Sequence, residues 1–169
     1  MLLNLASDVP FILDKWHYFF FDRKNLENLL PNFFSRLKKF PPDIFVITGP
    51  GYFSSTRIWV EVINILSFLG KFKVIYWLDK ISLFQQFLNQ NDLEVIYLFS
   101  GNKRIFIKTL SDSYELINKC ENPSEEFFSG IVSNKDIISY NKVLENYKSY
   151  NWNKSNYIRP FYVFQPIVG

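Results

Sequence analysis

The chain has very little cysteine, histidine and glycine. Among its 169 residues Cys120 is the only cysteine, His17 is the only histidine, and six residues are glycine. A single cysteine excludes an intramolecular disulfide and a cysteine-ligated metal site, and it favours a reducing compartment such as the cytoplasm. No serine or cysteine stands near His17 at motif spacing, so we expect a strand residue there rather than a general base.

Long apolar runs and a strong excess of one charge are also missing. No apolar segment approaches the ~20 residues that a membrane-spanning helix needs. Residues 1–15 lack the basic, apolar and cleavage regions of a signal peptide. We therefore expect a cytoplasmic protein with no membrane partner. The net charge of +3 and pI of about 8.9 allow a nucleic-acid partner without requiring one.

The most informative stretch that is present is residues 48–58, Thr-Gly-Pro-Gly-Tyr-Phe-Ser-Ser-Thr-Arg-Ile. It follows the β-branched and aromatic run 44–47, which predicts a buried strand. Gly49 and Gly51 on either side of Pro50 predict a tight turn. The turn lacks a Walker lysine and a complete dinucleotide fingerprint, so a plain turn is favoured over a phosphate site. Hydroxyl groups that can cap a following helix come next, at Ser54, Ser55 and Thr56.

The helix predicted over residues 56–69 is apolar around most of its circumference. One apolar face can pack on a sheet, whereas a second needs another helix or another protein. Internal burial and a partner interface are equally open from this pattern. Arg57 at the helix start can contact a phosphate or a partner carboxylate, or it can pair with Glu61 one turn later. The polar residues form one narrow stripe, Arg57, Glu61, Asn64 and Ser67.

The order of the remaining patterns predicts the fold class. Three short strands open the chain, within residues 2–21, and two hairpins are their simplest connection. Apolar spacing predicts a helix over 26–37, with Asn25 as its cap and Pro31 as a kink or early turn. The strand at 44–47 and the apolar helix follow, and then a strand at 72–77 and a helix at 82–88. This βββαβαβα order predicts an α/β fold of the ribonuclease-H-like or actin-like (ASKHA) kind, a mixed sheet with flanking helices.

A second unit is predicted after residues 89–92. Segments 94–99 and 103–110 have the pattern of strands joined by a Ser-Gly-Asn turn. A short strand near 131–133, a helix over 136–147 and an extended end complete it. The sequence thus predicts an N-terminal lobe of residues 1–90 and a reduced second lobe with a C-terminal tail, residues 91–169. The hairpin's basic residues favour a solvated edge over a tRNA contact.

Residues 49–58 resemble the GPGSFTGxRxG signature of the TsaB (YeaZ) family. Three further segments resemble the family in the same order: Leu29-Leu30-Pro31, residues 74–83, and Tyr157-Ile158-Arg159. The resemblance is thin over 112–156. Tyr52, Ser55 and Trp59 replace small family residues, and residues 5–8 lack the family's DTS. The outright matches are the motif-loop residues Gly49, Pro50, Gly51 and Phe53, together with Arg57.

The resemblance implies a non-catalytic subunit in threonylcarbamoyl-adenosine modification of tRNA. TsaB proteins pair through their first two helices with TsaD, the catalytic subunit that carries the metal, and they join the ATPase TsaE in a larger assembly. By carry-over the chain would form a heterodimer with a TsaD-like protein, meet a TsaE-like ATPase, contact tRNA only indirectly, form a homodimer when alone, and need no cofactor or metal. The implied partner-binding residues are Leu30, Phe34, Arg57, Trp59, Val62, Ile63 and Leu66.

The alternative is a small actin-like or kinase-like phosphotransferase that binds a nucleotide at residues 49–55. Such an enzyme needs a metal-binding carboxylate, for which Asp8 is the candidate with Asp14 nearby. It also needs small residues around the phosphates, where this chain has Tyr52 and Trp59. The scaffold interpretation is therefore preferred, and a nucleotide-dependent thermal shift would distinguish the two.

Overall fold

A computed structural model gives the fold and divides the chain into two compact units. The first unit is Met1–Lys80 with Trp152–Gly169, and the second is Ile81–Asn151. This division differs from the lobes predicted at residue 90, because the terminal segment returns to the first unit. The structure describes residues 1–4, 10–14, 17–22, 25–49, 53–91, 95–100, 103–108, 114–115, 130–132 and 137–162.

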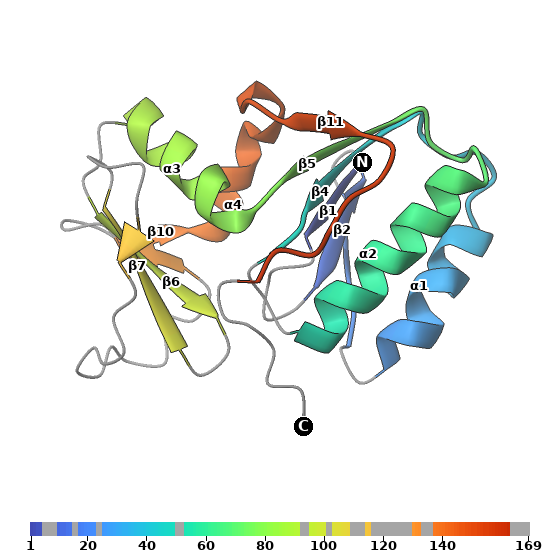
Figure 1. Cartoon of the computed structure of the whole chain (residues 1–169), viewed down its shortest axis with the longest axis horizontal. Coiled ribbons are helices and arrows are strands. Elements are labelled where there is room, and N and C mark those ends of the chain that lie inside the picture. Colours follow the sequence, from blue (N-terminus) through green and yellow to red (C-terminus); the bar gives the residue numbers. More distant parts are fainter. Residues whose placement is uncertain are drawn as a thin grey trace. The chain divides into compact units, whose positions relative to one another are not determined.

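The first unit contains a six-stranded sheet in the order β11-β5-β4-β1-β2-β3 (Figure 1). Strand β1 pairs with β4 in parallel, and β4 pairs with β5 in parallel. The β1-β2 and β2-β3 pairs are antiparallel, as the two predicted hairpins require. This mixed sheet with flanking helices confirms the predicted α/β, ribonuclease-H-like fold class. The strands are β1 (Leu2–Asn4), β2 (Phe11–Asp14), β3 (His17–Phe20), β4 (Asp43–Ile47), β5 (Val74–Leu78) and β11 (Asn153–Ser155).

Two helices, α1 (Leu26–Ser35) and α2 (Phe53–Phe68), lie side by side on one face of this sheet (Figure 1). Alternate strand residues point to opposite faces, so one set of side chains meets the helices. Leu3 and Val46 contribute to the core from the strands, and Trp59 and Ile63 contribute from α2, all with 0% of their surface exposed. The hydrophobic core of the first unit therefore lies between the sheet and the two helices.

The ends of both helices differ from the sequence prediction. Asn25 occupies the N-cap position of α1, but its side chain makes no capping hydrogen bond, and Pro31 lies inside the helix. Helix α2 begins at Phe53, so Thr56 is a buried residue within it rather than a cap. The first N–H groups of any helix have no intrahelical acceptor. Serines in the first turn are therefore compatible with this earlier start.

The described residues of the second unit form short strands and three helical segments. Strands β6 (Val95–Ser100), β7 (Lys103–Lys108) and β8 (Tyr114–Glu115) form an antiparallel sheet, which confirms the predicted β6-β7 hairpin. Strand β9 (Gly130–Val132) pairs with β10 (Ile137–Ser139). The helix predicted over 136–147 is wrong at its start, because β-branched Ile137 and Ile138 extend along β9. Its helices are α3 (Lys80–Asn91), α4 (Tyr140–Glu145) and the 3-10 turn Tyr147–Ser149.

Candidate functional site

Gly49, which follows β4, packs against a later segment of the same chain, residues 156–162. Gly49 has a positive φ of 136°, and a Cβ at this position would overlap the carbonyl oxygen of Phe161. The Phe161 N–H donates a hydrogen bond of 2.9 Å to the carbonyl oxygen of Thr48, and the Lys80 N–H donates to that of Gly49. Glycine is needed at residue 49 because of its backbone conformation and because the backbone of Phe161 approaches so closely. Pro50 and Gly51, the other glycine-turn residues, lie outside the described part.

Side chains of α2 hold this terminal segment, residues 156–162. The Asn64 amide donates to the Ile158 carbonyl oxygen at 2.9 Å and accepts from the Ile158 N–H at 3.0 Å. The Ser67 hydroxyl donates to the Asn156 carbonyl oxygen at 3.0 Å. Half of the polar stripe predicted on this helix thus binds backbone instead of facing water. Such bonds satisfy backbone groups that belong to no sheet ladder.

Charged side chains near the start of α2 interact with the same terminal segment. Arg57 and Glu61 are exposed on the helix, and both act on the Tyr162 phenol. Burial raises the pKa of Tyr162, the Arg57 guanidinium opposes this rise, and the Glu61 carboxylate adds to it. Arg57 thus combines an exposed position with a neighbour from the terminal segment.

Four of the predicted partner-binding residues are part of the core. Leu30, Trp59 and Ile63 have 0% of their surface exposed, and Phe34 has 3%. The Trp59 ring meets Phe21 edge to face, with centroids 5.3 Å apart. These side chains belong to the core between the sheet and the helices. Of the predicted set, Arg57 is exposed, and Val62 and Leu66 are half-buried.

The sequence interpretation missed the apolar side chains that do face outward. On α2 these are Ile65 with 57% and Phe68 with 91% of their surface exposed, directly after α2 Leu69 with 58%, and on α1 Leu29 with 36%. A helix brings positions three, four and seven apart onto one side. We call the group Val62, Ile65, Leu66 and Leu69, which has this spacing, the outer stripe. The spacing of these residues is visible in the sequence. Almost every residue of the helix is apolar, however, so the sequence does not show which side faces the sheet.

Two further features limit what the described residues can do. No group of three or more His, Cys, Asp or Glu side chains in the described ranges is placed to hold a metal ion. Asp8, the candidate metal-binding carboxylate, lies outside those ranges. Asp14 ends β2 opposite His17 of β3, which is confirmed as a strand residue. Within the same ranges, none of the helices has the length and apolar character needed to span a membrane.

The fold and the outer stripe define an α/β protein of ribonuclease-H-like kind with an exposed apolar helix surface. No protein-family model and no curated protein matches the sequence. A solved structure of YeaZ from Pseudomonas aeruginosa is similar over 74% of this chain and 70% of that chain, with 14% identity and a TM-score of 0.45. A second, an uncharacterized protein with similarity to peptidase YEAZ from Pseudomonas aeruginosa, is similar over 70% of this chain and 62% of that chain, with 15% identity and a TM-score of 0.42. Both structures carry the family name YeaZ.

Proposed function

We propose that this chain is a non-catalytic scaffold subunit that binds a TsaD-like catalytic partner in threonylcarbamoyl-adenosine modification of tRNA. In this proposal the chain forms a cytoplasmic heterodimer, meets a TsaE-like ATPase in the larger assembly, and touches tRNA only indirectly. The family resemblance of residues 49–58 supplies the partner. The surface of α1 and α2 supplies the means of binding it.

The outer stripe is the observation that carries this proposal. Ile65 and Leu69 leave more than half of their surface in water, one helical turn apart. Burying an aliphatic side chain of this size contributes about 1.5–3 kcal/mol. These two side chains contribute little to folding while exposed, so their use in an interface explains why an apolar residue stands at each position. Leu29 of the neighbouring α1 extends the same apolar character.

The glycine turn supports a scaffold over the alternative phosphotransferase. A nucleotide-binding turn uses the absence of glycine side chains to bring phosphate close to its backbone. At Gly49 that close approach is made by the carbonyl group of Phe161. Packing of the terminal segment is therefore a sufficient reason for this glycine.

Co-expression with the TsaD-like protein of the same genome tests the proposal. Size-exclusion chromatography with light scattering should show a one-to-one complex. Ile65→Glu places a charge in the proposed interface and should weaken the complex by tenfold or more, while its circular dichroism spectrum and melting temperature stay close to those of the unchanged chain. Lys142→Glu introduces a glutamate at an exposed position of α4. This variant is the matched control and should leave the complex intact.

Two results would overturn the proposal. The first is separate elution of the two proteins even when the TsaE-like ATPase is present. The second is a complex that Ile65→Glu and Leu69→Glu leave unchanged, because the outer stripe would then not be the interface. Light scattering of the chain alone also tests the homodimer: a second copy paired through the same stripe should dissociate on Ile65→Glu.

A further inference from the structure

One end of the first unit gathers positive charge. Two connections reach this end, residues 36–42 between α1 and β4 and residues 69–73 between α2 and β5. Neither contains an acidic residue, whereas the whole chain has a net charge of only +3. No carboxylate within the described ranges forms an ion pair with the basic residues of these connections. We call these five exposed residues the basic end: Arg36, Lys38, Lys39, Lys71 and Lys73.

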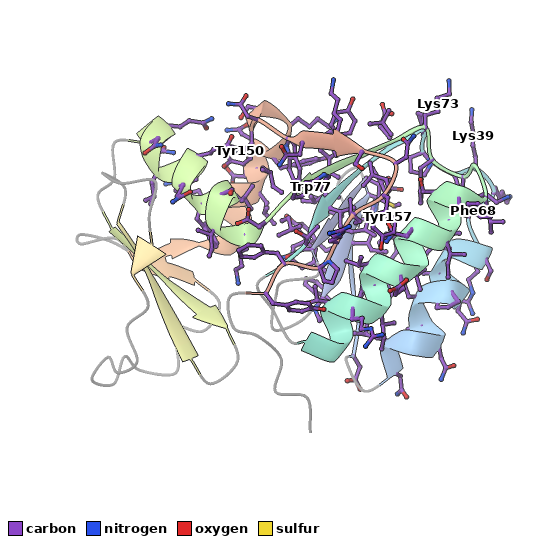
Figure 2. The ribbon with its side chains drawn as sticks, viewed as in Figure 1. Lys39, Phe68, Lys73, Trp77, Tyr150 and Tyr157 are labelled. Carbon is purple, nitrogen blue, oxygen red and sulfur yellow. The ribbon has the colours of Figure 1, made fainter. Side chains whose placement is uncertain are left out.

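Backbone and ring contacts hold the two connections together. The Lys73 N–H donates a 2.7 Å hydrogen bond to the Pro42 carbonyl oxygen. The Phe40 and Phe72 rings lie 5.6 Å apart, and the Lys71 ammonium lies 5.6 Å from the Phe40 centroid. Figure 2 shows Lys39 and Lys73 projecting at the end of the unit where α2 finishes at Phe68. The cations therefore form one surface, although they come from separate parts of the sequence.

A hollow beside this surface is lined by aromatic rings. It has a volume of about 390 Å³ and is bordered by Lys73, by Phe68 at the end of α2, and by Tyr157 from the terminal segment. Figure 2 labels these three residues. Phe68 leaves 91% and Tyr157 58% of its surface exposed, so neither ring is placed there by core packing. Asn64 and Ser67 also line the hollow, and both hydrogen-bond to backbone oxygens. The hollow thus offers exposed rings next to exposed cations.

We propose that the basic end and this hollow bind single-stranded nucleic acid, with phosphates on the lysines and a base stacked on Phe68 or Tyr157. Single-strand sites elsewhere combine a cationic track with exposed aromatic rings in this way. The negative end of the α2 dipole would account for the cations next to its last turn, but not for Lys38 and Lys39 on the other connection. Five cations are also more than the phosphate of one mononucleotide needs, which favours a strand over a free nucleotide.

The site uses other side chains than the outer stripe, which it adjoins at Leu69, and the inference does not rest on the proposed partner. Failure of one proposal therefore leaves the other standing. A membrane surface is the competing use for exposed rings among lysines. The observations favour nucleic acid, because Asn64 and Ser67 also line the hollow, and a polar lining does not favour an acyl chain.

Fluorescence anisotropy of the chain with a labelled oligouridylate of about 12 nucleotides tests the site, since single-strand sites span ~4–16 nucleotides. Binding should weaken as salt rises. In the double variant K71Q/K73Q the slope of log affinity against log salt should fall by about 1.4, from ~0.7 for each of two lost phosphate contacts. Phe68→Ala should weaken binding about 5- to 150-fold, the effect of one lost base stack, without changing the slope. Phe68→Tyr keeps a ring and should retain the affinity.

The control K142Q/K148Q removes two exposed lysines from the second unit and should change neither affinity nor slope. Every variant is first checked for an unchanged circular dichroism spectrum and melting temperature. An equal loss in K142Q/K148Q and K71Q/K73Q would overturn the proposal, because binding would then be diffuse attraction. So would competition by uridine monophosphate as strong as competition by the unlabelled strand. Binding to anionic vesicles but not to the oligonucleotide would assign the surface to a membrane instead.

Discussion

The two sides of α2 have nearly the same composition and opposite surroundings. Ile63 lies against the sheet with 0% of its surface exposed, while Ile65, two residues later, has 57% exposed. Both are isoleucines in the middle of one helix, so side-chain chemistry does not distinguish them. The position of the sheet does, because it covers one side of the helix and leaves the other uncovered. An apolar residue of this helix is therefore buried or exposed according to what lies opposite it.

Alanine at the two isoleucines should give the largest contrast. Ile63→Ala leaves a cavity in the core and should lower the free energy of unfolding by about 2–5 kcal/mol. Ile65→Ala removes a side chain that is mostly in water, so its effect should stay within about 0.5 kcal/mol. Urea denaturation followed by circular dichroism measures both. Equal losses would show that the outer side of α2 is covered within the chain itself.

The two glycines of positive φ extend the comparison to the backbone. Gly49 has a φ of 136° and faces the Phe161 carbonyl group, whereas Gly70 has a φ of 68°, and a Cβ added there would have nothing within 4 Å. Gly70→Ala should therefore cost only its backbone conformation, about 1–2 kcal/mol. Gly49→Ala adds a steric conflict, for a total of about 2–4 kcal/mol. Faster hydrogen exchange at the Phe161 amide in Gly49→Ala alone would locate the conflict, and equal exchange in both variants would contradict it.

Much of the first unit could be predicted from the sequence. The βββαβαβα order and both hairpins follow from β-branched runs, helical spacing and turn residues, which are local signals. Strand β11 was missed because Asn153–Ser155 is polar and short, and it becomes a strand only by pairing with β5. The start of the last helix was wrong because pairing with β9 overrides the local pattern at Ile137.

The candidate site was predicted only in part. The pattern of residues 49–58 predicted a helix, which starts at Phe53, but the partner of Gly49 is Phe161, more than a hundred residues away in the sequence. The apolar pattern of α2 indicated surplus hydrophobic surface, yet it could not show which side the sheet covers. For that reason the predicted partner-binding set included Trp59 and Ile63, which the fold buries. The basic end was invisible because its lysines belong to two separate connections.

Asn64 and Ser67 bond to the same terminal segment from a buried and a more open position. The buried Asn64 amide makes two hydrogen bonds to the Ile158 backbone. In Asn64→Ala the buried Ile158 groups lose their partners, and we expect a loss of about 1–3 kcal/mol. Ser67→Ala frees groups that water can reach and should cost about 0.5 kcal/mol. Thermal denaturation ranks the two. A larger loss in Ser67→Ala would mean that the segment is held mainly at Asn156.

The buried Tyr150 and the exposed Tyr157 extend the comparison to pH dependence, where the smallest effect is expected. Burial raises the pKa of Tyr150 to about 12 from its ordinary value of 10.0, and its hydroxyl donates a 2.6 Å hydrogen bond to the Val143 carbonyl oxygen. The folded chain holds this proton more tightly than the unfolded chain. The resulting stabilisation is complete below pH 10 and is lost as the pH rises toward 12.

Tyr150→Phe removes both the hydrogen bond and the ionisable group. At neutral pH the variant should be less stable by about 1 kcal/mol. Between pH 10 and 12 this difference should shrink, because only the unchanged chain is destabilised by ionisation of Tyr150. Tyr157→Phe, at a ring with 58% of its surface exposed, is the matched change and should leave stability nearly unaltered at neutral pH. Urea denaturation at a series of pH values measures these differences against the background of ten tyrosines. A difference for Tyr150→Phe that stays constant up to pH 12 would show that the phenol is open to water in the folded chain.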